Sequence, residues 1–285
     1  MKLATFKKND QYRLGRIEGS EVVDLSEANL PNEMSALISS PDLLEIAKYS
    51  TGKAHPISEV QLCSPILRPK KILAIGLNYK DHIAETGLAT PDFPMFFNKQ
   101  ATAANYPYAS IHLPKVSDKL DYEGELGFVI GRKCRHVTKE DAHRAIAGYV
   151  VCNDVSVRDW QMKAQTFTLG KSFDTHSPFG PWLTTKDEIQ DPHNLDLKTW
   201  VNDELRQDSN TKHLVFDCYD QIATLTAAFT LEVGDLILTG TPSGVGIGFD
   251  PKKFLQEGDK VRVEIENLGY IENKVIREPS STKLI

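Results

Sequence analysis

The sequence predicts a strand-rich α+β protein. Apolar and polar side chains alternate with a period of two over residues 122–130, 150–154 and 261–265, and such alternation indicates strands. Few helical stretches separate these runs, which favours a mixed or antiparallel sheet over a doubly wound parallel one. The composition, with 40% hydrophobic and 25% charged residues in 285 positions, is that of a globular chain with enough apolar residues for a large core.

The N-terminal region combines short strands with helix. Residues 1–26 alternate apolar and polar side chains around two turn sequences and therefore predict two or three strands; the turns are Lys8-Asn9-Asp10 and Glu18-Gly19-Ser20. A helical stretch is expected over residues 34–49, with Pro41 at the start of a second helix.

A segment rich in glycine, proline and serine, residues 50–69, predicts a linker. We therefore expect a small N-terminal α/β domain with its linker in residues 1–68 and a larger main domain in residues 69–285.

The main domain opens with an apolar strand over residues 72–75 that ends at Gly76. Helices are expected over residues 139–145 and 217–229. Two Gly-Asp pairs each predict a turn that begins a strand; they are Gly234-Asp235 and Gly258-Asp259.

Charge and cysteine usage exclude several classes of protein. A net charge of −6 and a pI near 5.8 disfavour nucleic acid or an anionic membrane as partner, because both are negatively charged and bind basic surfaces. No run approaches the ~18 apolar residues of a membrane helix, and the N-terminus lacks the apolar core of a secretory signal. The four cysteines form no CxxC pair, so we expect reduced thiols in a cytoplasmic protein.

Two acidic residues lie two positions apart in the run 122–130. Glu123 and Glu125 would project from the same face of a strand, with Leu126, Phe128 and Ile130 on the other. A solvated acidic edge is the simpler interpretation of such a pair. The apolar run that follows favours a central strand, and Gly124 between the two acids predicts close approach of another element.

A third carboxylate, Asp154, is expected where the strand 150–154 ends. It could instead cap the following helix, which is the commoner role of such an aspartate. Three carboxylates without a histidine favour a hard cation, Mg²⁺ or Mn²⁺, and would leave coordination positions open for water and substrate. The sequence therefore predicts a divalent-metal site on Glu123, Glu125 and Asp154.

A histidine and a glutamate lie three positions apart after the first strand of the main domain. On a helical turn His82 and Glu85 would be neighbours, and the carboxylate would make the imidazole a better general base. The spacing alone is a weak signal, because it also occurs on exposed helices.

Two glycine-containing segments resemble nucleotide-binding motifs, and neither fits. Gly170-Lys171-Ser172 would need a phosphate-loop glycine at position 165, which is Gln165. The glycines at 244, 246 and 248 miss the dinucleotide spacing, because Phe249 stands where the third glycine belongs.

Together, these motifs resemble the fumarylacetoacetate hydrolase superfamily over residues 70–277. The resemblance rests on five segments in a fixed order: Gly76-Leu77-Asn78-Tyr79 with His82 and Glu85; Tyr122-Glu123-Gly124-Glu125-Leu126; Asn153-Asp154-Val155-Ser156 with Arg158 and Gln161; Gly170-Lys171-Ser172-Phe173-Asp174; and the run from Thr239 to Gly246.

The resemblance implies a β-rich roll or sandwich with peripheral helices, beside the small N-terminal module. It implies metal ligation by Glu123, Glu125 and Asp154, and a catalytic role for a His82–Glu85 pair on a lid and for Lys171 near the metal. Three further residues match positions that contact substrate oxygens: Arg158, Gln161 and Thr241. A homodimer is expected.

The implied activity is that of a Mg²⁺- or Mn²⁺-dependent hydrolase that cleaves a carbon–carbon bond of a 2,4-dioxo acid through an enolate. The same site would support oxaloacetate decarboxylation or tautomerisation, or isomerisation of 2-hydroxyhepta-2,4-diene-1,7-dioate, because each of these also forms an enolate. A non-catalytic, metal-binding oligomer is a further alternative. Fold and metal do not decide among these reactions.

Overall fold

The computed structural model describes residues 1–283, and its architecture confirms the predicted strand-rich α+β class. One large sheet runs through the whole molecule in the order β4-β3-β2-β1-β14-β12-β11-β17-β6-β7, with β5 paired to β1 and β8 paired to β14. Its strands are β1 (Lys2–Lys8), β2 (Gln11–Glu18), β3 (Glu21–Asp24), β4 (Ala54–Pro56), β5 (Gln61–Cys63), β6 (Ile72–Gly76), β7 (Met95–Lys99), β8 (Ala104–Asn105), β11 (Gly124–Ile130), β12 (Ile146–Asn153), β14 (Ser177–Thr185) and β17 (Leu236–Leu238).

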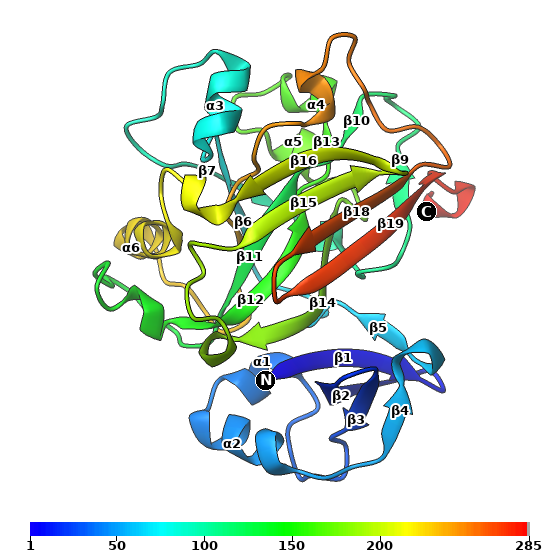
Figure 1. The fold of residues 1–285 in the computed structure, drawn as a ribbon, viewed down its shortest axis with the longest axis vertical. Coiled ribbons are helices and arrows are strands. Elements are labelled where there is room, and N and C mark those ends of the chain that lie inside the picture. Colours follow the sequence, from blue (N-terminus) through cyan, green and yellow to red (C-terminus); the bar gives the residue numbers. More distant parts are fainter. Residues whose placement is uncertain (284–285) are drawn as a thin grey trace.

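A second, five-stranded sheet lies against the central strands of the first (Figure 1). Its order is β16-β15-β18-β19-β9, and its strands are β9 (Ile111–Leu113), β15 (Asp196–Val201), β16 (Glu204–Asn210), β18 (Lys260–Ile265) and β19 (Gly269–Arg277). A short ladder joins β10 (Leu120–Asp121) to β13 (Ser156–Val157). The helices are α1 (Met34–Ile38), α2 (Pro41–Tyr49), α3 (Lys80–Thr86), α4 (Arg158–Gln161), α5 (Thr168–Lys171) and α6 (Cys218–Ala228).

The space between the two sheets is the main hydrophobic core. Leu126, Phe128 and Ile130 of β11 are fully buried in it together with Val263 of β18, so the predicted apolar face is confirmed. Gly124 fits closely against the second sheet, because a Cβ there would lie 2.2 Å from the Thr199 hydroxyl oxygen. The close approach expected at this glycine is therefore present, and a larger residue would push the sheets apart.

The N-terminal module, below the body in Figure 1, adds its strands to the main sheet through β1 and β14, where Lys2 pairs with Thr184. Leu3 and Leu37 of the module share one buried cluster with Val150 and Leu183 of the body. The expected linker over residues 50–69 is not a free connection, because β4 and β5 lie within it. We retain the division between residues 68 and 69, which falls between β5 and β6, as a proposal.

The predicted helices agree with the structure except at residues 139–145. Only a 3-10 turn, Ala142–Arg144, forms there. Both Gly131 and Arg132 donate backbone hydrogen bonds to Ala145, at 2.8 and 3.3 Å, and these bonds return the chain to the sheet before a helix can extend. In residues 1–283 no helix is both long and apolar enough to span a membrane.

Candidate active site

The strand register brings the three predicted carboxylates together. Glu123 directly precedes β11, Glu125 lies on it, and Asp154 follows β12, whose Asn153 pairs with Gly124. One oxygen from each of the three carboxylates lies within 4.8 Å of the others. All three residues are buried, Asp154 completely, which excludes the solvated acidic edge considered from the sequence.

The electrostatics of this cluster fit a divalent cation. Burial, and then the charges of Asp154 and Glu123, raise the pKa of Glu125 well above its usual value, while its carboxylate accepts one hydrogen bond from the Gly240 amide, at 2.7 Å. A buried carboxylate with so few favourable partners destabilises the folded state unless it binds a cation or a proton. Three oxygen donors of this kind are those that Mg²⁺ and Mn²⁺ prefer.

Two buried lysines flank the carboxylates. Lys171 of α5 donates to Glu123 and, at 2.7 Å, to Asp154. Burial opposes its charge, but the two carboxylates outweigh burial and raise the pKa of Lys171. Lys99 at the end of β7 donates to Asp154 at 2.5 Å and to the Val155 carbonyl at 3.2 Å. Lys99 was not predicted as a site residue, because no local pattern in the run Met95–Lys99 marks this lysine as inward-facing.

Arg158 and Asp121 form a second ion pair beside the cluster. Arg158 donates through Nε to Asp121 at 2.7 Å and contacts Glu123 through Nη1 at 2.6 Å. Burial opposes ionisation of Glu123, but the charges of Lys171 and Arg158 outweigh burial and lower the pKa of Glu123 to about 2. The Nη2 atom of Arg158 is buried and has no hydrogen-bond partner among residues 1–283, so it can donate to a ligand oxygen.

His82 and Glu85 lie side by side on α3. His82 Nδ1 is 2.9 Å from Glu85 Oε2, and the other Glu85 oxygen accepts the Gly244 amide at 2.9 Å. Burial opposes the charge of Glu85, but these hydrogen bonds outweigh it and lower its pKa. The anionic carboxylate thereby fixes the ring and leaves Nε2 available for proton transfer.

One cavity of about 280 Å³ joins these groups. Of the residues predicted from the sequence, it is lined by His82, Glu123, Glu125, Arg158, Gln161, Lys171 and Thr241. Asp154 and Glu85 do not line the cavity. Each contacts a residue that does, Asp154 through Lys171 and Glu85 through His82. The Thr241 hydroxyl donates to the Gly124 carbonyl at 3.0 Å and accepts from Gln207 at 2.8 Å, so it also supports the strand that carries the glutamates.

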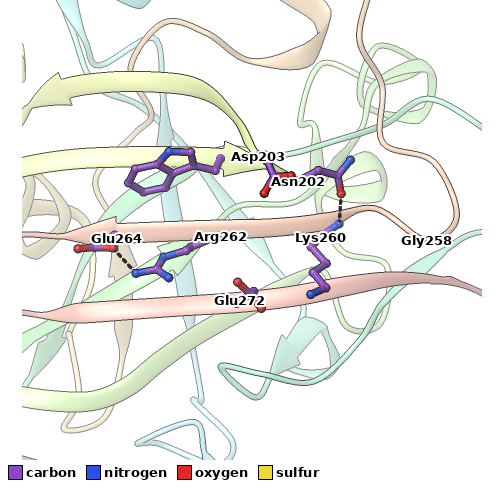
Figure 2. A pocket seen from close by; sticks show the side chains of 8 residues that line it. Asn202, Asp203, Gly258, Lys260, Arg262, Glu264 and Glu272 are labelled. Atoms are coloured by element: carbon purple, nitrogen blue, oxygen red, sulfur yellow. Dashed lines mark hydrogen bonds and ion pairs between the residues drawn. The ribbon is translucent and has the colours of Figure 1, made fainter.

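A larger hollow of about 640 Å³ lies on the outer face of the second sheet. Figure 2 shows charges of both signs there, with Arg262 paired to Glu264 at 2.5 Å and Asn202 accepting from the Lys260 backbone amide at 3.0 Å. These side chains are solvated and neutralise one another, so the hollow lacks the buried, uncompensated groups that distinguish the cavity beside α3.

Replacing Lys99 with methionine is expected to destabilise the metal-free protein by about 3–5 kcal/mol, because it removes one partner of a buried ion pair. Its side chain is fully buried against Asp154. Added Mg²⁺ should restore part of the loss by compensating the Asp154 charge. Thermal unfolding with Mg²⁺ and with chelator measures both effects.

Lys253→Met is the matched control for Lys99→Met, because it breaks the exposed pair with Glu204, and exposed pairs contribute at most about 1 kcal/mol. Equal shifts for the two variants would contradict a compensating role of Lys99.

Comparison with known proteins gives consistent matches over nearly the whole chain. The family model described as fumarylacetoacetate (FAA) hydrolase C-terminal matches residues 71–276. The mitochondrial oxaloacetate tautomerase fahd2 of Xenopus laevis is 41% identical over 288 aligned residues, covering 97% of this chain and 90% of the relative. Oxaloacetate tautomerase YisK of Bacillus subtilis is 38% identical, covering 96% of this chain and 100% of the relative.

A solved structure also resembles the chain. Maleylpyruvate hydrolase from Sphingobium sp. SYK-6, in complex with manganese(II) and pyruvate, matches with a TM-score of 0.82 and 34% identity, covering 98% of this chain and 100% of that one. The fold therefore has counterparts in proteins that are named as enzymes of small oxo acids, one of them solved with manganese(II) and pyruvate.

Proposed function

This chain belongs to the fumarylacetoacetate hydrolase superfamily, and on that premise we propose that it is a divalent-metal-dependent enzyme that interconverts the keto and enol forms of a small 2-oxo acid. Oxaloacetate is the first substrate to test, because two relatives that match almost the whole chain are oxaloacetate tautomerases. One observation carries the proposal: a single cavity is lined by two of the three clustered carboxylates, Glu123 and Glu125, and by His82.

Glu123, Glu125 and Asp154 would hold Mg²⁺ or Mn²⁺, which would supply Lewis-acid polarisation of the 2-oxo acid. His82, oriented by Glu85, would take the proton from C3. Lys171 has three donor hydrogens and uses two on carboxylates, so the third can stabilise the developing enolate oxygen. Transfer of the proton held by His82 to that oxygen would give the enol, and the reverse transfers would regenerate the ketone.

Hydrolysis of a 2,4-dioxo acid is the second candidate. The His82–Glu85 pair favours it, because an imidazole held by a carboxylate can equally deprotonate water. The likeness to a maleylpyruvate hydrolase also favours it. Both reactions need an enolate, and they differ in whether C3 loses a proton or the C3–C4 bond breaks.

A substrate panel separates the candidates. Oxaloacetate, acetylpyruvate and fumarylacetoacetate are incubated with protein and Mg²⁺, Mn²⁺ or chelator, while enol absorbance, pyruvate and CO₂ are followed separately. We expect metal-dependent exchange of the oxaloacetate enol signal without CO₂ release. Activity that survives exhaustive chelation would overturn the metal dependence. Lack of turnover on every oxo acid would favour a non-catalytic role.

We also propose a homodimeric assembly and a cytoplasmic location. The mitochondrial name of the Xenopus relative makes an organelle the alternative location. Sedimentation of the purified protein tests the first, and microscopy of the tagged protein in its own cells tests the second.

A further inference from the structure

One buried side chain connects the second sheet to the carboxylate cluster. Gln207 of β16 is 1% exposed. Its Oε1 accepts the Gly124 backbone amide at 2.9 Å, and its Nε2 donates to the Thr241 hydroxyl at 2.8 Å and to the Pro242 carbonyl at 2.9 Å. A carboxamide carries one acceptor oxygen and two donor hydrogens, so both polar atoms of this side chain are fully engaged.

The partners fix the orientation of this amide. A backbone N–H can only donate and a carbonyl can only accept, so the oxygen of Gln207 has to face Gly124 and its nitrogen has to face Pro242. The Thr241 hydroxyl accepts from the Gln207 nitrogen and donates to the Gly124 carbonyl at 3.0 Å. Gln207, Gly124 and Thr241 therefore form a closed cycle of three hydrogen bonds, which requires both an acceptor and a donor on the side chain at position 207.

The cycle takes the place of a strand partner. β17 pairs with β11 over residues 127–129, so Gly124, at the start of β11, lies beyond the end of that ladder. A buried backbone N–H or C=O without a partner costs free energy. Gln207 satisfies the amide of Gly124 and Thr241 satisfies its carbonyl, so two side chains do here what a neighbouring strand does elsewhere in the sheet.

Gly124 lies between two of the three carboxylates that would hold the cation. Its amide belongs to the peptide group that joins it to Glu123, and its carbonyl belongs to the peptide group that joins it to Glu125. Gln207 therefore holds the first peptide group directly and the second through Thr241. Fixing these two peptide groups sets the positions from which both glutamate side chains leave the backbone, and hence the spacing of their carboxylates.

We propose that Gln207 is a positioning residue for the reaction, which acts through Gly124 and Thr241 to hold Glu123 and Glu125 at the spacing that the divalent cation requires. This inference rests on the proposed function, since it assumes that these carboxylates bind the cation. Gln207 is not among the residues that line the cavity, so its effect on turnover is exerted through the residues that it holds.

Gln207→Met tests the proposal, because methionine has nearly the same length and volume and makes none of the three hydrogen bonds. In the full chain we expect the Kd for Mn²⁺, measured by calorimetric titration, to rise at least about tenfold and kcat to fall at least about tenfold, since loss of a residue that supports a metal ligand typically costs about 10–100-fold. The EPR line shape of the bound Mn²⁺ should change as well, because it reports the arrangement of the ligands. A merely structural role of Gln207 would leave that line shape unaltered.

Asn273→Leu is the matched control. Asn273 lies on β19 of the same sheet, is fully buried, and its Nδ2 donates to three backbone carbonyls, those of Tyr106, Pro107 and Ala109. Both variants replace a buried amide by an apolar side chain of similar size and remove three hydrogen bonds, so both should lower the melting temperature. In Asn273→Leu the Kd for Mn²⁺, the EPR line shape and kcat should keep their wild-type values.

Gln207→Asn keeps the proposal falsifiable if Gln207→Met does not fold. Asparagine carries the same amide and takes up less space, but it is one methylene shorter and cannot reach Gly124 and Thr241 together. We therefore expect Gln207→Asn to fold, to bind Mn²⁺ more weakly than the wild-type protein and to show an altered EPR line shape.

A folded Gln207→Met or Gln207→Asn that binds Mn²⁺ with the wild-type Kd and line shape would overturn this inference. Equal changes in Asn273→Leu would also overturn it, because loosening any part of the sheet would then produce them. Lack of wild-type turnover on every oxo acid would overturn the proposed function, while the Kd and the line shape would still decide whether Gln207 positions the cation ligands. If the wild-type chain bound no Mn²⁺, both the proposed function and the inference would fail.

Discussion

Glu125→Gln is expected to raise the melting temperature of the metal-free protein and to abolish its Mg²⁺-dependent turnover. Glu125 is 1% exposed and lies beside two other carboxylates. Without a cation, its charge is repelled by Asp154 and Glu123. Glutamine keeps the oxygen that accepts the Gly240 amide and removes the repulsion, so the folded state gains stability relative to the unfolded chain.

Magnesium should make the wild-type protein more stable than Glu125→Gln, the reverse of the order expected in chelator. The wild-type protein gains about 2.7 kcal/mol when Mg²⁺ is present at a hundred times its Kd, whereas the variant has lost a ligand and should gain almost nothing. In chelator we expect Glu125→Gln to melt about 2–4 °C higher, the shift that roughly 1 kcal/mol produces in a protein of this size. Turnover should fall more than about a hundredfold. Replacing a residue that only hydrogen-bonds to a metal ligand already lowers metal affinity or activity about 10–100-fold, and Glu125 would itself be a ligand.

Scanning calorimetry with Mg²⁺ and with chelator measures the stability effect. Glu204→Gln serves as control, because Glu204 is half exposed and pairs with Lys253 away from the cluster. A Mg²⁺-induced shift of wild-type size in Glu125→Gln would show that the cation binds elsewhere. Lower stability of the variant in chelator would show that Glu125 has a compensating partner in the folded protein.

The part of the site that could be predicted from the sequence follows from local geometry. Strand alternation alone places Glu123 and Glu125 on one face and Phe128 on the other, and helical spacing alone pairs His82 with Glu85. Placing Asp154 beside the glutamates requires one further step. In an antiparallel pair the end of one strand lies beside the start of the other, as the end of β12 lies beside the start of β11. Each of these steps involves residues close in sequence or one strand pairing.

The part that could not be predicted depends on long-range register. Lys99 reaches Asp154 because β7 pairs with β6, β6 with β17, and β17 with β11, and no local pattern encodes this chain of pairings. The helix expected over residues 139–145 failed for the same reason, since distant strand contacts outweigh a short helical pattern.

The glycine-rich run that failed as a nucleotide motif proves to have a different role. The Gly246 and Ile247 amides donate to Asp121 at 2.7 and 3.0 Å, and the Gly244 amide donates to Glu85. A Cβ on Gly248 would lie 2.6 Å from a Glu85 oxygen. The glycines therefore allow one loop to hold two carboxylates, those that orient Arg158 and His82, and only the folded structure reveals those partners.

His82→Ala should lower kcat by about 10²–10⁴, the usual contribution of a positioned general base, while leaving the Kd for Mg²⁺ within about threefold of wild type. His82 is not among the carboxylates that would hold the ion, and its ring pairs with Glu85, so its loss leaves the cation site intact. Stopped-flow loss of the oxaloacetate enol signal gives kcat, and calorimetric titration gives the Kd.

Glu85→Gln separates orientation from basicity in the same pair. Glutamine can still accept the Gly244 amide, but it cannot provide the negative charge that raises the basicity of His82, so the activity of Glu85→Gln should lie between wild type and His82→Ala. If His82→Ala kept full activity in both enol exchange and pyruvate release, another group would have to move the proton. Lys171, already bound to two carboxylates, would be the candidate, and Lys171→Met would then have to remove the activity that His82→Ala left.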